Sequence, residues 1–175
     1  MKIYFFTIGV CILLLSNVAK AQKNLITNGG FEDDLYGWNN NGAQLTPYDL
    51  KSGKNSCAIV AHSTDKWVGI DQVIKVSKKM QVLEFSAWIK TQNVVKGEHD
   101  WDGAIFTVVF LDSKDKEIGD GVNIARLTGY QDWTLFNKVI KVPETAYSIK
   151  IMVAMGNASG TMLIDDVTAK MVSSS

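Results

Sequence analysis

The chain has 175 residues, with 18 basic and 18 acidic side chains and a hydrophobic content of 46%. This length suits one domain, because chains usually divide only beyond about 250 residues. A balanced charge without basic runs excludes the phosphate-neutralising patch of a nucleic-acid-binding protein. The hydrophobic content is sufficient for a packed core, so the composition also excludes a disordered chain.

Residues 1–21 have the pattern of a secretory signal peptide. Lys2 gives a positive start, residues 3–15 are almost all apolar, and Ala19 and Ala21 form the small-x-small pattern that signal peptidase recognises. A membrane anchor would need a longer apolar run of roughly 20 residues. A lipoprotein would need a cysteine at the cleavage point. We therefore expect cleavage after Ala21 and a secreted protein, extracellular or periplasmic, without a membrane segment.

Cleavage would leave residues 22–175 as a single domain. It would remove two lysines and no acid, which leaves 16 basic and 18 acidic side chains and a formal charge of −2. Cys57 would be the only cysteine, so no intrachain disulfide could form and the core or a metal would have to hold the fold. Cys57 lies in an apolar run, which predicts a small buried side chain rather than a nucleophile.

Apolar residues recur with the two-residue period of β-strands along most of the chain. Leu83, Phe85, Ala87 and Ile89 share one face of the first clear example, at positions 82–90. Turn residues separate this run from further β-rich runs at 56–61, 68–76, 104–111, 134–142, 147–155 and 161–171. No stretch shows a helical period. The pattern predicts eight or nine strands in an all-β fold, an antiparallel β-sandwich of the jelly-roll type.

Several segments, in the right order, resemble secreted carbohydrate-binding modules of the family 4, 9 and 22 type, which have a galactose-binding-domain-like jelly roll. The most specific are N-G-G-F-E at 28–32 and I-D-D-V at 164–167. Weaker matches lie at 37–38, 52–56, 67–70, 86–90 and 129–133. The resemblance implies a non-catalytic domain that binds a polysaccharide or oligosaccharide. Such modules are usually attached to a glycoside hydrolase, so it also implies a partner enzyme, which here would be bound non-covalently.

The resemblance further implies a structural calcium ion. Ca²⁺ takes six to eight oxygen ligands, and carboxylates buried together without a cation would repel each other. In the family, the ligands are the glutamate of the first motif, the carbonyl of the glycine before it, the first aspartate of the last motif, and loop carbonyls. Carried over, the predicted metal site contains Gly30, Glu32, Gly53, Ser56 and Asp165. The alternative is that these acids are exposed turn residues.

The five tryptophans are candidates either for the core or for contact with the flat apolar face of a sugar ring. Trp38 follows a turn and Trp133 begins a strand, so both are expected to pack. Trp67 begins a strand after a polar loop, and Trp88 lies opposite the apolar face of its strand. Trp101 lies in a polar loop, where an exposed ring is costly unless it is used.

Polar side chains would bind the hydroxyl groups around the sugar ring. The complete predicted ligand-binding set is Trp67, Trp88, Trp101, Glu84, Lys90 and Lys150. Beside Lys150, the same strand face offers Met152 and Ala154, where relatives often have polar groups. No catalytic residue is predicted.

Two other functions stay open. A small jelly-roll glycoside hydrolase would need two carboxylates about 5–10 Å apart, and only Glu84 with an acid of residues 98–102 offers such a pair. A polysaccharide lyase would need a base and several basic residues, and Arg126 is the single arginine. Residues 98–102 fit a solvated loop better than a metal or catalytic cluster. A surface module that binds a protein partner would show an exposed apolar patch.

Overall fold

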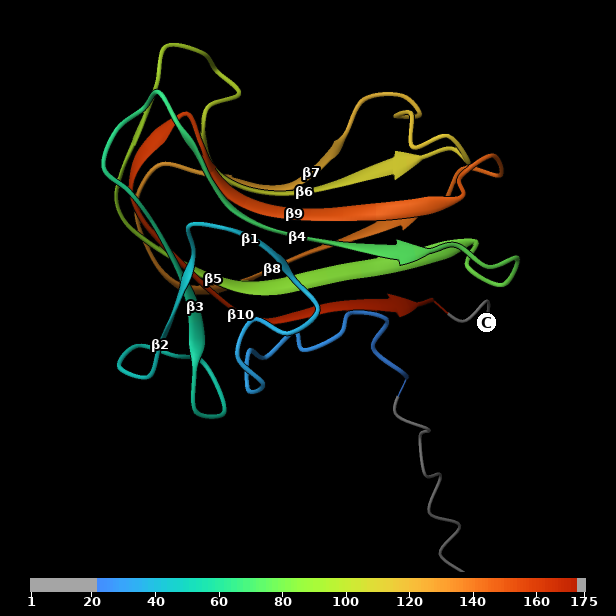
Figure 1. The fold of residues 1–175 in the computed structure, drawn as a ribbon, viewed down its shortest axis with the longest axis horizontal. Helices are drawn as coiled ribbons and strands as arrows, with labels where there is room; N and C mark the ends of the chain where they lie inside the picture. The colour runs from blue at the N-terminus through green and yellow to red at the C-terminus, as the bar shows by residue number, and fades with distance from the viewer. Residues whose placement is uncertain (1–21, 173–175) are drawn as a thin grey trace, which may run out of the picture.

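The computed structural model describes residues 22–172, so the predicted signal peptide and its cleavage site lie outside the described residues. Within these residues, ten strands form two antiparallel sheets of five strands each, which pack face to face (Figure 1). Sheet A has the order β1-β4-β9-β6-β7, and sheet B has the order β2-β3-β10-β5-β8. The predicted antiparallel β-sandwich is therefore confirmed.

The strands have these bounds: β1 Asn39–Asn41, β2 Gln44–Thr46, β3 Ser56–Ala61, β4 Trp67–Lys75, β5 Val82–Lys96, β6 Gly103–Leu111, β7 Val122–Leu127, β8 Gly129–Lys141, β9 Ser148–Gly156 and β10 Ala158–Met171. β3 coincides with its predicted run, and burial in β5 alternates as predicted from Leu83 to Ile89. Sequence patterns missed β1, β2 and β7. β1 consists of three exposed asparagines, a residue type that strands disfavour, and exists because it pairs with β4.

The core fills the space between the sheets, and Trp38 belongs to it. This tryptophan is 7% exposed, its ring centroid lies 5.6 Å from that of Phe31, and its Nε1 donates to the Asn28 carbonyl at 3.1 Å. Its predicted packing role is confirmed. Cys57 is also fully buried, and burial raises the pKa of its thiol to about 12. The thiol is therefore uncharged at neutral pH, as expected of a core side chain.

The chain before β1 runs beside β10 and brings the first and last sequence motifs together. The amide of Leu25 donates to the Ala169 carbonyl, and the amide of Val167 donates to the Gly29 carbonyl, both at 2.8 Å. A Cβ on Gly29 would collide with the Val167 carbonyl oxygen, so this close approach requires glycine. The contact places Glu32 near the aspartates of the last motif.

Sheet A bends into a trough, which we define as its outer face, turned away from sheet B (Figure 1). The loops at 62–66 and 97–102 stand at the same end of this trough, where β4 and β6 begin. Within residues 22–172, no helix has the length and apolar character needed to cross a membrane.

Candidate functional site

The structure divides the six predicted ligand-binding residues between opposite sides of the sandwich. Trp67 of β4 and Lys150 of β9 belong to sheet A, and the loop that carries Trp101 leads directly into β6 of the same sheet. The other three alternate with buried residues of β5 and project from the outer face of sheet B: Glu84, Trp88 and Lys90. The hydrophobic core separates the two groups, so the alternative stacking residues Trp67 and Trp88 would belong to different sites.

Trp67 lies at the end of a row across three strands in which the other two positions are glycines. In β9, Gly156 pairs with Trp67, and in β6, Gly103 pairs with Gly156, so one row across three strands reads Trp67–Gly156–Gly103. The indole is 37% exposed, and a Cβ built on Gly156 would lie 3.8 Å from the indole Cδ1 atom. Gly156 is partly exposed beside the indole, whereas Gly103 is buried and a Cβ on it would meet Arg126 Cγ at 3.5 Å, so the open part of the row is Trp67 with Gly156.

Polar side chains continue along the trough from this row. The Asp71 carboxylate accepts a hydrogen bond from Asn39 Nδ2 at 2.9 Å and lies 3.7 Å from Lys150 Nζ. Asn41 donates its side-chain amide to the Trp67 carbonyl at 2.8 Å, which ties β1 to the start of β4. Amide, carboxylate and ammonium groups are thus grouped on the indole's side of the sandwich.

Asp71, Asn39 and Asn41 were not predicted. Asp71 could have been found, because it lies four residues after Trp67 in an alternating strand and so shares its face. The asparagines of β1 carry no strand pattern that would have placed them. Farther across the trough, Met152 stands between Asp71 and Thr107 in one row, and the Thr107 hydroxyl is 2.6 Å from Asn123 Oδ1.

The loop at 97–102 ends in a buried acid and does not contribute the predicted carboxylate pair. Glu84 lies near the start of β5 and the loop follows its far end, and each residue of a strand adds about 3.3 Å. The two acids proposed for hydrolysis are therefore much too far apart. Trp101 is 62% exposed as predicted, and residues 98–100 are exposed as a solvated loop should be, but Asp102 is only 2% exposed.

On sheet B, residues 47–55 form a loop across the outer face, which we call the strap. Lys51 Nζ lies 3.8 Å from the centroid of the Trp88 ring. Asp49 lies 2.9 Å from Lys90 Nζ and accepts a hydrogen bond from the Trp133 indole at 2.8 Å. Trp133 is thus half-buried against the strap instead of packing in the core, contrary to its expected role.

Electrostatics hold the strap in place. Burial raises the pKa of the Asp49 carboxyl, but hydrogen bonds from Lys90 and Trp133 outweigh it and keep this pKa below its ordinary value. The hydrogen bond to Asp49 raises the pKa of Lys90. Because both groups are charged at neutral pH, Lys90 forms an ion pair with Asp49 of the strap. The strap also partly covers Trp88 through Lys51.

The predicted metal-site residues meet where the strap returns to β3. Glu32 Oε1 accepts the backbone N–H groups of Lys54 and Asn55 at 2.8 and 3.1 Å, and Gly53 has no room for a side chain beside this carboxylate. These two N–H groups lower the pKa of Glu32. The Ser56 hydroxyl instead donates to the Asp49 carbonyl at 2.7 Å.

Asp165 is fully buried beneath the strap. Its Oδ2 accepts the N–H groups of Lys51 and Ser52 at 2.9 and 3.0 Å, and its Oδ1 accepts the N–H of Asp166 at 2.7 Å. Burial raises the pKa of this carboxyl more than the three N–H donors lower it. Burial therefore makes the ionised form of Asp165 costlier than that of an exposed aspartate, and positive charge placed nearby would offset this cost.

The residues present fit a calcium ion in part. A buried carboxyl with a raised pKa favours a nearby cation. Asp166 Oδ1 lies 3.6 Å from the position of a Cβ on Gly30 and accepts the Ser52 hydroxyl at 3.0 Å, so a third carboxylate adjoins the two of the predicted set. Within residues 22–172, however, no three acidic, histidine or cysteine side chains are spaced to hold a metal. Backbone carbonyls would have to complete the ligands.

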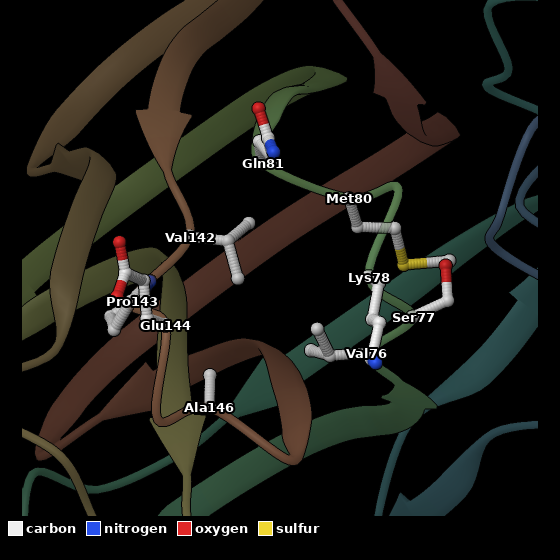
Figure 2. Close-up of a pocket in the computed structure, with 9 residues that line it drawn as sticks. All are labelled: Val76, Ser77, Lys78, Met80, Gln81, Val142, Pro143, Glu144 and Ala146. Carbon is white, nitrogen blue, oxygen red and sulfur yellow. The ribbon is translucent and has the colours of Figure 1, made fainter.

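A hollow of about 340 Å³ opens at the other end of the sandwich, between the loops that follow β4 and β8 (Figure 2). Val76, Val142 and Ala146 line it together with Met80. Lys78, Gln81 and Glu144 also belong to the lining, and no aromatic ring is among the residues described around it. The hollow lacks the aromatic surface that the trough has.

No family model and no curated protein matches this sequence. Solved structures do match. The CBM22-1 xylan-binding domain of Paenibacillus barcinonensis Xyn10C is 22% identical with a TM-score of 0.61, and the match covers 90% of this chain and 99% of that domain. TmCBM61, solved with β-1,4-galactotriose, is 18% identical with a TM-score of 0.55 and coverage of 86% and 99%.

The enzymatically active domain of bacteriophage CBA120 tailspike protein 4 also matches, with 17% identity and a TM-score of 0.64. That match covers 85% of this chain but only 21% of the tailspike chain. At these identities the likeness concerns the fold, and at that level the resemblance seen in the sequence is confirmed. The chain has the galactose-binding-like jelly-roll fold of carbohydrate-binding modules.

Proposed function

We propose that this protein is a non-catalytic carbohydrate-binding module that binds a polysaccharide or oligosaccharide in the trough of sheet A. The observation that carries the proposal is the pair Trp67–Gly156, in which an accessible indole adjoins a partly exposed strand position without a side chain. A sugar ring has a flat C–H face that packs on an aromatic ring. The fold supports the same function, because the neighbours include a xylan-binding domain and a module bound to galactotriose.

The polar groups of the trough would bind the hydroxyl rim of the sugar. Asp71 accepts hydrogen bonds, Lys150 donates them, and the amides of Asn39 and Asn41 do both. These groups already bond to one another or to backbone, so they are held in place before a ligand arrives. Each hydroxyl exchanges water bonds for protein bonds with little net gain, so we expect weak to moderate affinity.

A glycan screen on the purified protein tests the proposal, with xylohexaose and β-1,4-galactotriose as the first soluble probes. Trp67→Ala should weaken binding about thirtyfold, which corresponds to about 2 kcal/mol for a central aromatic contact. Tyr130→Ala is the matched control, because it removes a 73% exposed ring from β8 in sheet B. Equal losses in both variants, or binding by neither the wild type nor the variants, would contradict the proposal.

The proposal also includes secretion of the protein and a separate enzyme that acts on the bound glycan. The sequence of residues 1–21 supports secretion to the periplasm or the exterior, where a polysaccharide would be met. The separation of Glu84 from residues 98–102 supports binding without hydrolysis, so a separate enzyme would act on the same glycan. Mass spectrometry of the secreted protein should show Gln22 as the first residue. Release of reducing sugar from a bound polysaccharide would instead indicate an enzyme.

We also propose a structural Ca²⁺ beside the strap, held by carboxylates of Glu32 and Asp165 with loop carbonyls near Gly30, Gly53 and Ser56. The ion would neutralise the buried Asp165 and stabilise the loops without touching the sugar. At a calcium concentration one hundred times the Kd, it would add about 2.7 kcal/mol to the free energy of unfolding. Chelation should therefore lower the Tm by roughly 5–11 °C, and re-added calcium should restore it. An unchanged melt with no metal by elemental analysis would refute the site.

A further inference from the structure

The loop at 97–102 presents a pair of stacked rings at the tryptophan end of the trough. The imidazole of His99 and the indole of Trp101 lie 4.5 Å apart between centroids and are nearly parallel, at 13°. Trp101 is 62% exposed, and the loop ends at Gly103, the last residue of the row that begins with Trp67. A ring pair in this position extends the aromatic surface beyond the sheet.

A buried carboxylate fixes the base of this loop. Asp102 Oδ2 accepts the backbone N–H of His99 at 3.0 Å, and His99 Nδ1 lies 3.3 Å from the same oxygen. Asp102 Oδ1 accepts the side-chain amide of Asn157 at 3.3 Å. The N–H of His99 is the main cause that lowers the pKa of Asp102, so the carboxylate is charged at neutral pH. One oxygen thus contacts both the backbone and the ring of His99.

The outer side of the loop is held by different groups. Lys96 Nζ lies 2.8 Å from Asp100 Oδ1, and Arg126 Nη1 donates to the Asp100 carbonyl at 3.3 Å. Both contacts are made by Asp100, and neither is made by the His99 or Trp101 ring. The Trp101 ring itself stacks on the imidazole of His99, and Asp102 contacts that imidazole.

We propose that Asp102 is a positioning residue of the glycan site, which acts through His99 to hold the exposed Trp101 indole in a ligand-ready orientation. This inference rests on the proposed function. A mobile tryptophan would lose rotamer freedom when a sugar binds, and a preoriented one has already lost it. Loss of the positioning should therefore weaken glycan binding about fivefold, which is less than the loss of the ring itself.

A double-mutant cycle tests the coupling, with xylohexaose or β-1,4-galactotriose as the probe. Asp102→Ala should raise the Kd about fivefold in the wild-type background and leave it unchanged in a Trp101→Ala background. His99→Ala is the second variant, because it breaks the stack at a half-exposed side chain and leaves the buried carboxylate in place. Equal effects of Asp102→Ala in both backgrounds would overturn the proposal.

A measurement on the ligand-free protein separates this inference from the proposed function. Relaxation of the Trp101 indole ¹⁵N–¹H group should show a rigid ring in the wild type and in Lys96→Ala. The ring should become mobile on the nanosecond timescale in both His99→Ala and Asp102→Ala. If Trp101 is equally rigid in all four proteins, Asp102 does not position it, whether or not a glycan binds. If its mobility changes as expected but no glycan binds, the proposed function fails and the positioning stands.

Discussion

The two outer faces of this sandwich carry similar side chains, but the tryptophan on one face is accessible and the tryptophan on the other is partly covered. Sheet A presents Trp67 with Lys150 and Asp71, and sheet B presents Trp88 with Lys90 and, on the strap, Asp49. On sheet A the indole adjoins bare glycine backbone, whereas on sheet B a lysine lies over the indole and the carboxylate is part of a covering loop. If sheet A binds the glycan as proposed, residue types alone do not distinguish the binding face, whereas access to the ring does.

The largest expected effect comes from removing the carboxylate beneath the strap. Asp165→Ala leaves the N–H groups of Lys51, Ser52 and Asp166 without their acceptor. Hydrogen bonds to a charged group contribute about 1.5–3 kcal/mol each, and because these three are only partly buried we expect the free energy of unfolding to fall by about 4 kcal/mol. The Tm should fall by roughly 8–16 °C.

Thermal unfolding measures this change, with Asp132→Ala as the control for loss of an exposed carboxylate. Glycan affinity of the folded Asp165→Ala protein should stay within about twofold of the wild type, because the trough lies on the other sheet. A Tm within about 3 °C of the wild type would mean that Asp165 does not hold the strap.

An intermediate effect is expected from adding a side chain at Gly156. A Cβ on Gly156 would meet Ile105 at 3.5 Å and both Gly103 and the Trp67 indole at 3.8 Å, which is ordinary contact. Gly156→Val should therefore fold normally, and because glycine weakens strands it should change stability by no more than about 1 kcal/mol. The added side chain would stand where the sugar is proposed to lie. Calorimetric titration should show binding weakened at least tenfold.

Gly156→Ala provides a graded comparison, since one methyl group should obstruct the space beside Trp67 less than the valine side chain. Tight binding by a folded Gly156→Val protein would show that the sugar does not use this row.

The smallest effect is expected from the lysine that covers Trp88. Lys51→Ala removes a cation–π contact at an exposed site, which contributes about 0.5–1 kcal/mol. The Tm should fall by roughly 1–4 °C, and glycan binding should not improve or weaken. If titration of Lys51→Ala showed a second bound glycan per protein, Trp88 would belong to a binding site on sheet B that Lys51 covers in the wild type.

The alternation of β5 was sufficient to predict which of its side chains face the core, because burial of one sheet face imposes a period of two. The same rule placed Trp67 and Trp88 outward but could not distinguish them. That distinction depends on residues 47–55, which cross sheet B through long-range contacts of Asp49 and Lys51 that no local pattern contains. Asp102 was missed for a similar reason, since its partner Asn157 is 55 positions away.

The most direct test of glycan binding in the trough is a titration of the ¹⁵N-labelled protein with an oligosaccharide that it binds. The titration is observed at the tryptophan indole N–H resonances. Assignments come from single Trp→Phe variants. We predict that the Trp67 and Trp101 signals shift with one common Kd, while those of Trp88 and Trp133 remain in place. Shifts confined to Trp88 and Trp133 would place the glycan on sheet B and contradict binding in the trough.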